Sequence, residues 1–146
     1  MDFQSLNEKG ALILDAAITV HRILGPGLLE SAYFRALRKE LQLRGLHVQW
    51  QVPVPLYYKG EDIGEAYMLD LLVDDEIIIE LKAVEVLLPI HQAQVITYLK
   101  LSERHLGYLV NFNVPLLKQG FKRLVHDWPK EEALTPGSSS SSNNQT

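Results

Sequence analysis

Two acids and a lysine interrupt one of the most apolar parts of the sequence. Asp70, Glu80 and Lys82 lie in the stretch from Tyr67 to Ala83, which is otherwise rich in leucine, isoleucine and valine. An isolated carboxylate buried there would carry a large desolvation penalty. A divalent cation would remove much of that penalty, and carboxylate ligands suit Mg²⁺ or Mn²⁺. A lysine beside the metal could orient an attacking water or offset charge on a phosphate.

This chemistry requires a particular pairing of two strands. Glu80 and Lys82 are two residues apart, so they share one face of a strand. Asp70 lies opposite Glu80 only if the loop between the strands has an odd number of residues, or a bulge, near Asp74–Glu76. A plain two-residue turn would instead place Asp70 opposite Ile79. The sequence therefore makes a register prediction that a structure can refute.

Each of the other polar candidates also has a purely structural explanation. The three charged residues could simply pair with one another at a solvated sheet edge. Glu30 stands where a helix begins, and the helix dipole alone accounts for an acid there. Gln94 and Tyr98 are four residues apart on one helix face, and His91 lies one turn before Gln94. The spacing of the five histidines does not match a zinc site.

The elements that must position these residues follow from periodicity and from turn residues. A capping-box pattern at Ser5–Glu8 and a helical apolar repeat predict a first helix over residues 6–23. Gly25-Pro26-Gly27 ends it, and a second helix runs from about Leu28 to Gly45. Residues 47–56 alternate with period two, which predicts a strand, and prolines on its polar face place it at a sheet edge. Its apolar face comprises Val48, Trp50, Val52, Val54 and Leu56.

Further strands are predicted at residues 63–73, 76–84, 107–113 and 121–126. A helix over residues 89–102 would pack through Ala93, Ile96 and Leu99. The predicted fold class is α/β with a mixed sheet. Residues 1–129 form a single domain, and residues 130–146, which contain five successive serines, form a disordered tail.

Composition restricts the function classes. With 146 residues, 47% of them hydrophobic, the chain can build one sizeable core, and no stretch is long enough to cross a bilayer. Zero cysteines exclude disulfides and thiolate metal sites, and we expect a soluble cytoplasmic protein. The net charge of −4 argues against holding nucleic acid by bulk electrostatics, although a local basic groove remains compatible with it.

One segment resembles a named protein family. Gly27-Leu-Leu-Glu30-Ser-Ala-Tyr33 matches the pattern G-x-x-E-x-x-Y of the GxxExxY proteins, and the similarity extends over about residues 6–125. Other matching segments lie at residues 51–55, 79–83, 88–91 and 110–116. This family is grouped with the PD-(D/E)xK nuclease superfamily. The resemblance implies a restriction-endonuclease-like αβββαβ core with an additional N-terminal helix, and Mg²⁺-dependent cleavage of phosphodiester bonds.

The resemblance also implies roles for individual residues. Asp70 would be the acid of the first motif half, with Leu69 where proline is common, and Glu80 and Lys82 would form the E-x-K half. The metal ligands would be Asp70, Glu80 and the carbonyl of Leu81. Glu30 would correspond to a helix-borne glutamate that binds metal directly or through water.

The third helix would carry the rest of the site. Gln94 and Tyr98 match a Q-x-x-x-Y motif, with Gln94 beside Lys82 as a further catalytic residue. Tyr98, together with Tyr33 and His91, is a candidate for substrate contact.

The first hypothesis is therefore a metal-dependent nuclease acting on nucleic acid, with DNA as the favoured substrate and Mg²⁺ or Mn²⁺ as cofactor. The alternative is a catalytically silent module that keeps the nuclease fold for binding or structure. A glycosidase using the carboxylates as acid and base ranks below both, because it gives Lys82 no role. A homodimer is compatible with the sequence, but no motif demands one.

Overall fold

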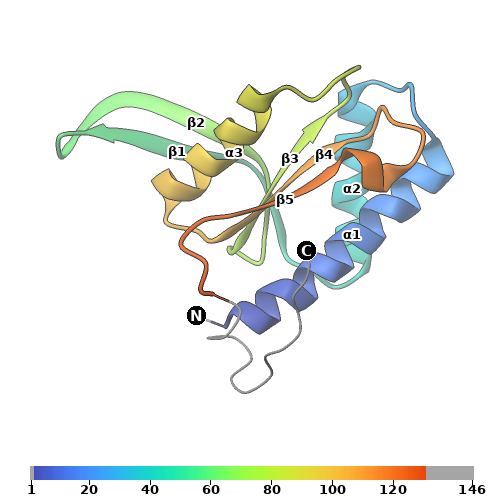
Figure 1. The fold of residues 1–146 in the computed structure, drawn as a ribbon, viewed down its shortest axis with the longest axis horizontal. Coiled ribbons are helices and arrows are strands. Elements are labelled where there is room, and N and C mark those ends of the chain that lie inside the picture. The colour runs from blue at the N-terminus through green and yellow to red at the C-terminus, as the bar shows by residue number, and fades with distance from the viewer. Residues whose placement is uncertain (1, 131–146) are drawn as a thin grey trace.

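The structure is a computed structural model that describes residues 2–130. Three α-helices, five strands and one short 3-10 helix alternate along it (Figure 1). In chain order they are α1 (Phe3–Leu24), α2 (Glu30–Leu43), β1 (Val48–Tyr58), β2 (Glu61–Val73), β3 (Ile77–Lys82), α3 (Pro89–Ser102), β4 (Leu106–Asn111), η1 (Leu117–Gly120) and β5 (Phe121–Val125). The predicted tail lies outside the described residues, apart from Lys130.

The five strands form one mixed sheet in the order β1-β2-β3-β4-β5. Neighbouring strands are antiparallel except β3 and β4, which are parallel and are joined by α3. The succession from α2 to β4 is the αβββαβ order expected from the sequence, and α1 is the additional N-terminal helix. The fold class is confirmed as mixed α and β, consistent with a restriction-endonuclease-like architecture.

Helices cover both faces of the sheet and divide the core into two clusters (Figure 1). The larger cluster lies between the sheet and α1 with α2, and the smaller one lies under α3. Ile77, Ile79 and Leu81 of β3 face the larger cluster, whereas Ile78 faces α3. Because side chains alternate along a strand, Glu80 and Lys82 follow Ile78 on the α3 face. Within the described residues, no helix combines the length and the hydropathy that crossing a bilayer requires.

The register prediction for β2 and β3 is confirmed. Leu71 pairs with Ile79 and Val73 pairs with Ile77, which leaves the three residues Asp74–Glu76 in the turn. Asp74 and Asp75 both have positive φ, at 51° and 58°, and the amide of Glu76 donates to the carbonyl of Val73. This odd-numbered turn brings Asp70 opposite Glu80.

Ion pairs hold this turn against the helices. Lys9 of α1 contacts Asp74 at 3.1 Å and Glu76 at 2.7 Å. Arg104, just after α3, contacts Asp75 at 2.9 Å. Residues of α1 and of the segment after α3 therefore hold the loop that sets the register.

The face assignment for the first strand is wrong in one respect. Val48 packs in the core under α1 and α2, whereas Val54 packs under α3, although they are an even number of residues apart. Gln51 lies between them with φ of 52°, and it stands opposite Asp70 because Trp50 pairs with Leu71 and Val52 with Leu69. The left-handed residue reverses the direction of the following side chains, which period-two reasoning does not foresee. The edge position of β1 is confirmed.

Two helix predictions also need correction. The N-cap of α1 is Asp2, whose carboxylate accepts the amide of Ser5 at 3.0 Å, so the helix starts before the expected Ser5 cap. In α3 the buried residues are Val95 and Leu99, while Ala93 is exposed. The larger valine, four residues before Leu99, fills the space against the sheet better than alanine does.

Candidate active site

The two acids occupy the point where the ladder between β2 and β3 ends. The amide of Asp70 donates to Oε2 of Glu80 at 2.8 Å, and the amide of Leu81 donates to Oδ2 of Asp70 at 2.9 Å. Each carboxylate therefore satisfies a backbone N–H of the opposite strand. At this point β2 and β3 are held together by carboxylate acceptors in place of backbone carbonyls.

Burial makes this pair of acids unusually basic. Glu80 is 8% exposed, and burial, followed by the charge of Asp70, raises its pKa to about 8. Burial also raises the pKa of Asp70, against the lowering effects of the Leu81 amide, Lys82 and a hydrogen bond to Glu80. With its pKa raised to about 8, Glu80 holds a proton at neutral pH in the metal-free protein. A cation at this point would take the place of that proton.

Lys82 and Glu30 complete the electrostatics of the site. The positive charge of Lys82 acts on all three acids, because it lowers the pKa values of Glu30, Asp70 and Glu80. Glu30, at the first position of α2, is exposed, and burial and the charge of Asp70 raise its pKa. Residues from α2, β2 and β3 thus share one electrostatic field.

The donor set suits a hard divalent cation. Asp70 and Glu80 offer carboxylate oxygens side by side, and their raised pKa values show that their negative charge lacks full compensation. Among residues 2–130, however, no three histidine, cysteine, aspartate or glutamate side chains gather closely enough to form a metal cluster. Two carboxylates with a carbonyl and waters satisfy Mg²⁺, which usually keeps several waters.

Asn111 is a supporting residue that sequence reasoning missed. It is 2% exposed at the end of β4, its Oδ1 accepts the amide of Val84, and its Nδ2 donates to the Val84 carbonyl. The amide of Phe112 donates to the carbonyl of Lys82 at 3.0 Å. These bonds tie the segment after Lys82 to β4. Two signals in the sequence pointed to it: an amide side chain at the end of an apolar strand, and its place in the segment 110–116 that resembles the family.

Comparison with known proteins now decides the family. A family model described as PD-(D/E)XK nuclease superfamily matches residues 7–124. The chain belongs to this superfamily. No curated protein and no solved structure matches it. The narrower GxxExxY assignment stays a prediction. Nucleases of the superfamily generally use divalent metal ions.

One residue of the motif that suggested the superfamily has a structural task. Tyr33 is fully buried and stacks on Phe112 with ring centroids 4.6 Å apart. Its hydroxyl donates to the carbonyl of Gly25 at 2.5 Å and accepts the amide of Leu28 at 3.0 Å. Its expected contact with substrate is therefore wrong. Tyr33 instead fixes the loop that leads into Glu30.

Three candidate residues lie on α3, and the structure places each of them differently. Gln94 is exposed, and its role beside Lys82 stays a prediction. His91 caps the helix, because its Nδ1 accepts the amide of Leu88 at 3.1 Å. Tyr98 lies in the field of the acids, since burial and then the charges of Glu80 and Asp70 raise its pKa.

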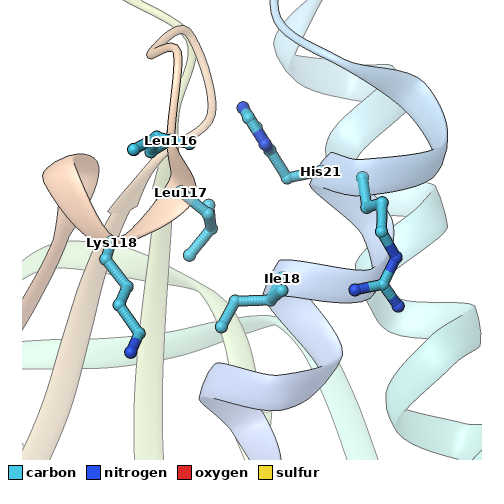
Figure 2. Close-up of a pocket in the computed structure, with 6 residues that line it drawn as sticks. Ile18, His21, Leu116, Leu117 and Lys118 are labelled. Atoms are coloured by element: carbon cyan, nitrogen blue, oxygen red, sulfur yellow. The ribbon is translucent and has the colours of Figure 1, made fainter.

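A hollow of about 380 Å³ lies away from these residues (Figure 2). Its lining comes from the end of α1 and the start of η1, and comprises Ile18, His21, Arg22, Leu116, Leu117 and Lys118. The His21 ring is anchored there by a 2.7 Å hydrogen bond between its Nε2 and the carbonyl of Val114. None of the superfamily's motif residues lines this hollow, so it is separate from the candidate active site.

Proposed function

We propose that the protein is a metal-dependent nuclease that hydrolyses phosphodiester bonds in nucleic acid, with DNA as the first substrate. The observation that carries this proposal is the hydrogen-bonded, buried pair of Asp70 and Glu80 beside Lys82. Superfamily membership supports the reaction class.

The metal would be Mg²⁺ or Mn²⁺. Asp70, Glu80 and the carbonyl of Leu81 would hold it, and Glu30 would reach it through water because it is exposed and outside the tight pair. When bound, the ion supplies Lewis acidity and compensates charge on the phosphate. The two carboxylates would hold the ion at the site where the phosphate binds.

Lys82 would act on the attacking water and on the phosphate. Its ammonium group can donate hydrogen bonds to the water, and its positive charge would stabilise the negative charge of the phosphate. Water attacks phosphorus and the bond to the 3′ oxygen breaks, so the downstream product carries a 5′-phosphate. Gln94 would help to orient Lys82 and the water.

The test combines metal titration with cleavage. We expect wild-type protein to bind Mg²⁺ or Mn²⁺ in calorimetry and to cut labelled DNA or RNA, and Asp70→Ala to lose both. Glu8→Ala is the matched control, because Glu8 is an exposed acid on α1. If Asp70→Ala cuts as fast as wild type, the proposed site is wrong.

A silent binding module is the second candidate. It is favoured by the absence of a three-residue acid or histidine cluster among residues 2–130. Wild-type protein that binds no divalent ion and cuts neither DNA nor RNA would establish this alternative. The DNA preference, a homodimer and the cytoplasmic location remain predictions in either case.

A further inference from the structure

An aromatic pair from two different elements borders the acids. Tyr67 of β2 and Tyr98 of α3 have ring centroids 5.7 Å apart and an interplanar angle of 42°. Tyr67 is three residues before Asp70, or roughly 10 Å along the strand. The charges of Glu80 and Asp70 act on Tyr98, which places that ring close to the carboxylate pair. Tyr67 thus lies roughly 10 Å along β2 from the proposed site of cleavage, with the Tyr98 ring packed beside it.

Packing in the core accounts for the position of Tyr98 but not for the exposed part of the Tyr67 side chain. Tyr98 is half-buried against the core under α3, whereas Tyr67 remains 40% exposed, and its neighbour Met68 is 49% exposed. Part of the Tyr67 side chain beside the Tyr98 ring is therefore open to solvent. Tyr67 belongs to β2 of the β1–β2 hairpin, which projects beyond the helices (Figure 1), and Tyr98 belongs to α3, which packs against β1.

The net charge of the protein favours binding nucleic acid through its bases over binding it through ion pairs to its phosphates. The net charge is −4, and three acids, Glu30, Asp70 and Glu80, share the field of the site. Binding of duplex DNA relies on lysine and arginine that neutralise successive phosphates and release counterions. Stacking offers a source of affinity of another kind, because the faces of unpaired bases stack on tyrosine with a favourable energy that does not depend on charge.

We propose that Tyr67 and Tyr98 form a stacking platform for unpaired bases next to the scissile phosphate, so that the substrate is single-stranded at the point of cleavage. This inference rests on the proposed nuclease function and adds its substrate class. Bases within a duplex are already stacked on their neighbours and cannot offer their faces to the platform. A continuous duplex is therefore a poor substrate.

The experiment compares one oligonucleotide sequence as a single strand and as a duplex. Values of kcat and KM in Mg²⁺ are measured for wild type, Tyr67→Leu and Tyr67→Phe. Tyr57→Leu is the matched control, because Tyr57 is a 59% exposed tyrosine near the far end of the same hairpin. Binding is followed separately through a fluorescent base analogue in the single strand, using Lys82→Met, which keeps both carboxylates, with and without Tyr67→Leu.

We expect wild type to prefer the single strand, and Tyr67→Leu to raise KM for it by about tenfold with little change in kcat. Tyr67→Phe should restore the wild-type KM, since the ring and not the hydroxyl stacks, and Tyr57→Leu should leave it unchanged. Binding to the single strand should quench the base analogue only when Tyr67 is present.

Equal cleavage of the duplex, or an equal effect of Tyr67→Leu on both substrates, would overturn the stacking platform while leaving the nuclease in place. If binding quenches the base analogue through Tyr67 but the protein cuts nothing, the stacking platform is supported and the nuclease function is excluded. Absence of both cleavage and quenching would end both proposals.

Discussion

At the scale of single residues, the raised pKa of Glu80 affects both the stability of the fold and the chemistry of the site. The glutamate is buried next to a second acid, so its pKa is about 8 instead of the usual 4.5. The folded chain therefore keeps a proton that the unfolded chain releases above about pH 4.5. Groups that serve catalysis commonly carry such displaced pKa values.

This difference predicts how metal-free protein responds to pH. Between about pH 4.5 and about pH 8 the folded state binds more protons than the unfolded state, so the free energy of unfolding falls as pH rises. Glu80→Gln, which keeps an oxygen acceptor for the Asp70 amide, should flatten this dependence. Denaturant titrations with a chelator present measure it, and a wild-type profile without slope over that interval would contradict the buried acid pair.

Asn111 leads to a second prediction at this scale. Asn111→Leu leaves the half-buried amide and carbonyl of Val84 without their side-chain partner, which should cost about 1–3 kcal/mol in total. The segment after Lys82 should loosen, and kcat should fall more than KM changes. Asn113→Ala is the control, because only the backbone amide of Asn113 donates to Asn111. Unchanged kcat and stability in Asn111→Leu would show that the clamp is dispensable.

At the scale of elements, the turn between β2 and β3 decides whether the acids meet. Its three residues are required for Asp70 to stand opposite Glu80, and ion pairs to Lys9 and Arg104 secure it. These ion pairs are partly exposed and contribute little individually. The length of the turn matters more than its charges.

Deleting Asp75 tests the role of that length. A two-residue turn shifts the register by one residue and places Asp70 opposite Ile79. Metal binding and cleavage should therefore both be lost. Asp75→Gly keeps the length and suits the positive φ of 58°, and it should retain activity with a stability change within about 1 kcal/mol. Calorimetry with Mg²⁺ and circular dichroism distinguish a shifted register from an unfolded chain.

The sequence predicted most elements and this register because apolar periodicity and turn composition are local signals. It could not predict the reversal at Gln51, since a non-glycine residue with positive φ leaves no mark in the pattern of apolar residues. It also misassigned Tyr33. The motif places a tyrosine one turn after Glu30, but only the fold reveals that the ring stacks on Phe112, far away in the chain.

At the scale of the whole molecule, α1 belongs to the same body as the strands. Gly10 lies so close to the sheet that an added Cβ would stand 1.9 Å from the hydroxyl oxygen of Tyr108. The N-terminal helix is therefore packed closely against β4. It also supplies Lys9, which holds the turn behind the acids.

Gly10→Ala should destabilise the protein by about 1–3 kcal/mol through overpacking. Adding Tyr108→Phe removes the nearest atom and should recover part of the loss. Thermal unfolding of the single and double variants measures this coupling. Additive effects of the two substitutions would show that α1 does not touch Tyr108 in solution.

The exchange of backbone bonds between Asp70 and Glu80 has a consequence for how this lineage can change over time. Each acid satisfies an amide of the opposite strand, so replacing either one harms folding even in a copy that no longer needs to cut anything. Lys82 is only half-buried, and selection for folding protects it less. Among descendants that drift after gene duplication, the lysine should be lost before the acids. Under the proposed nuclease function, the presence of Lys82 would therefore be a better mark of copies that still cut nucleic acid than the presence of the two acids.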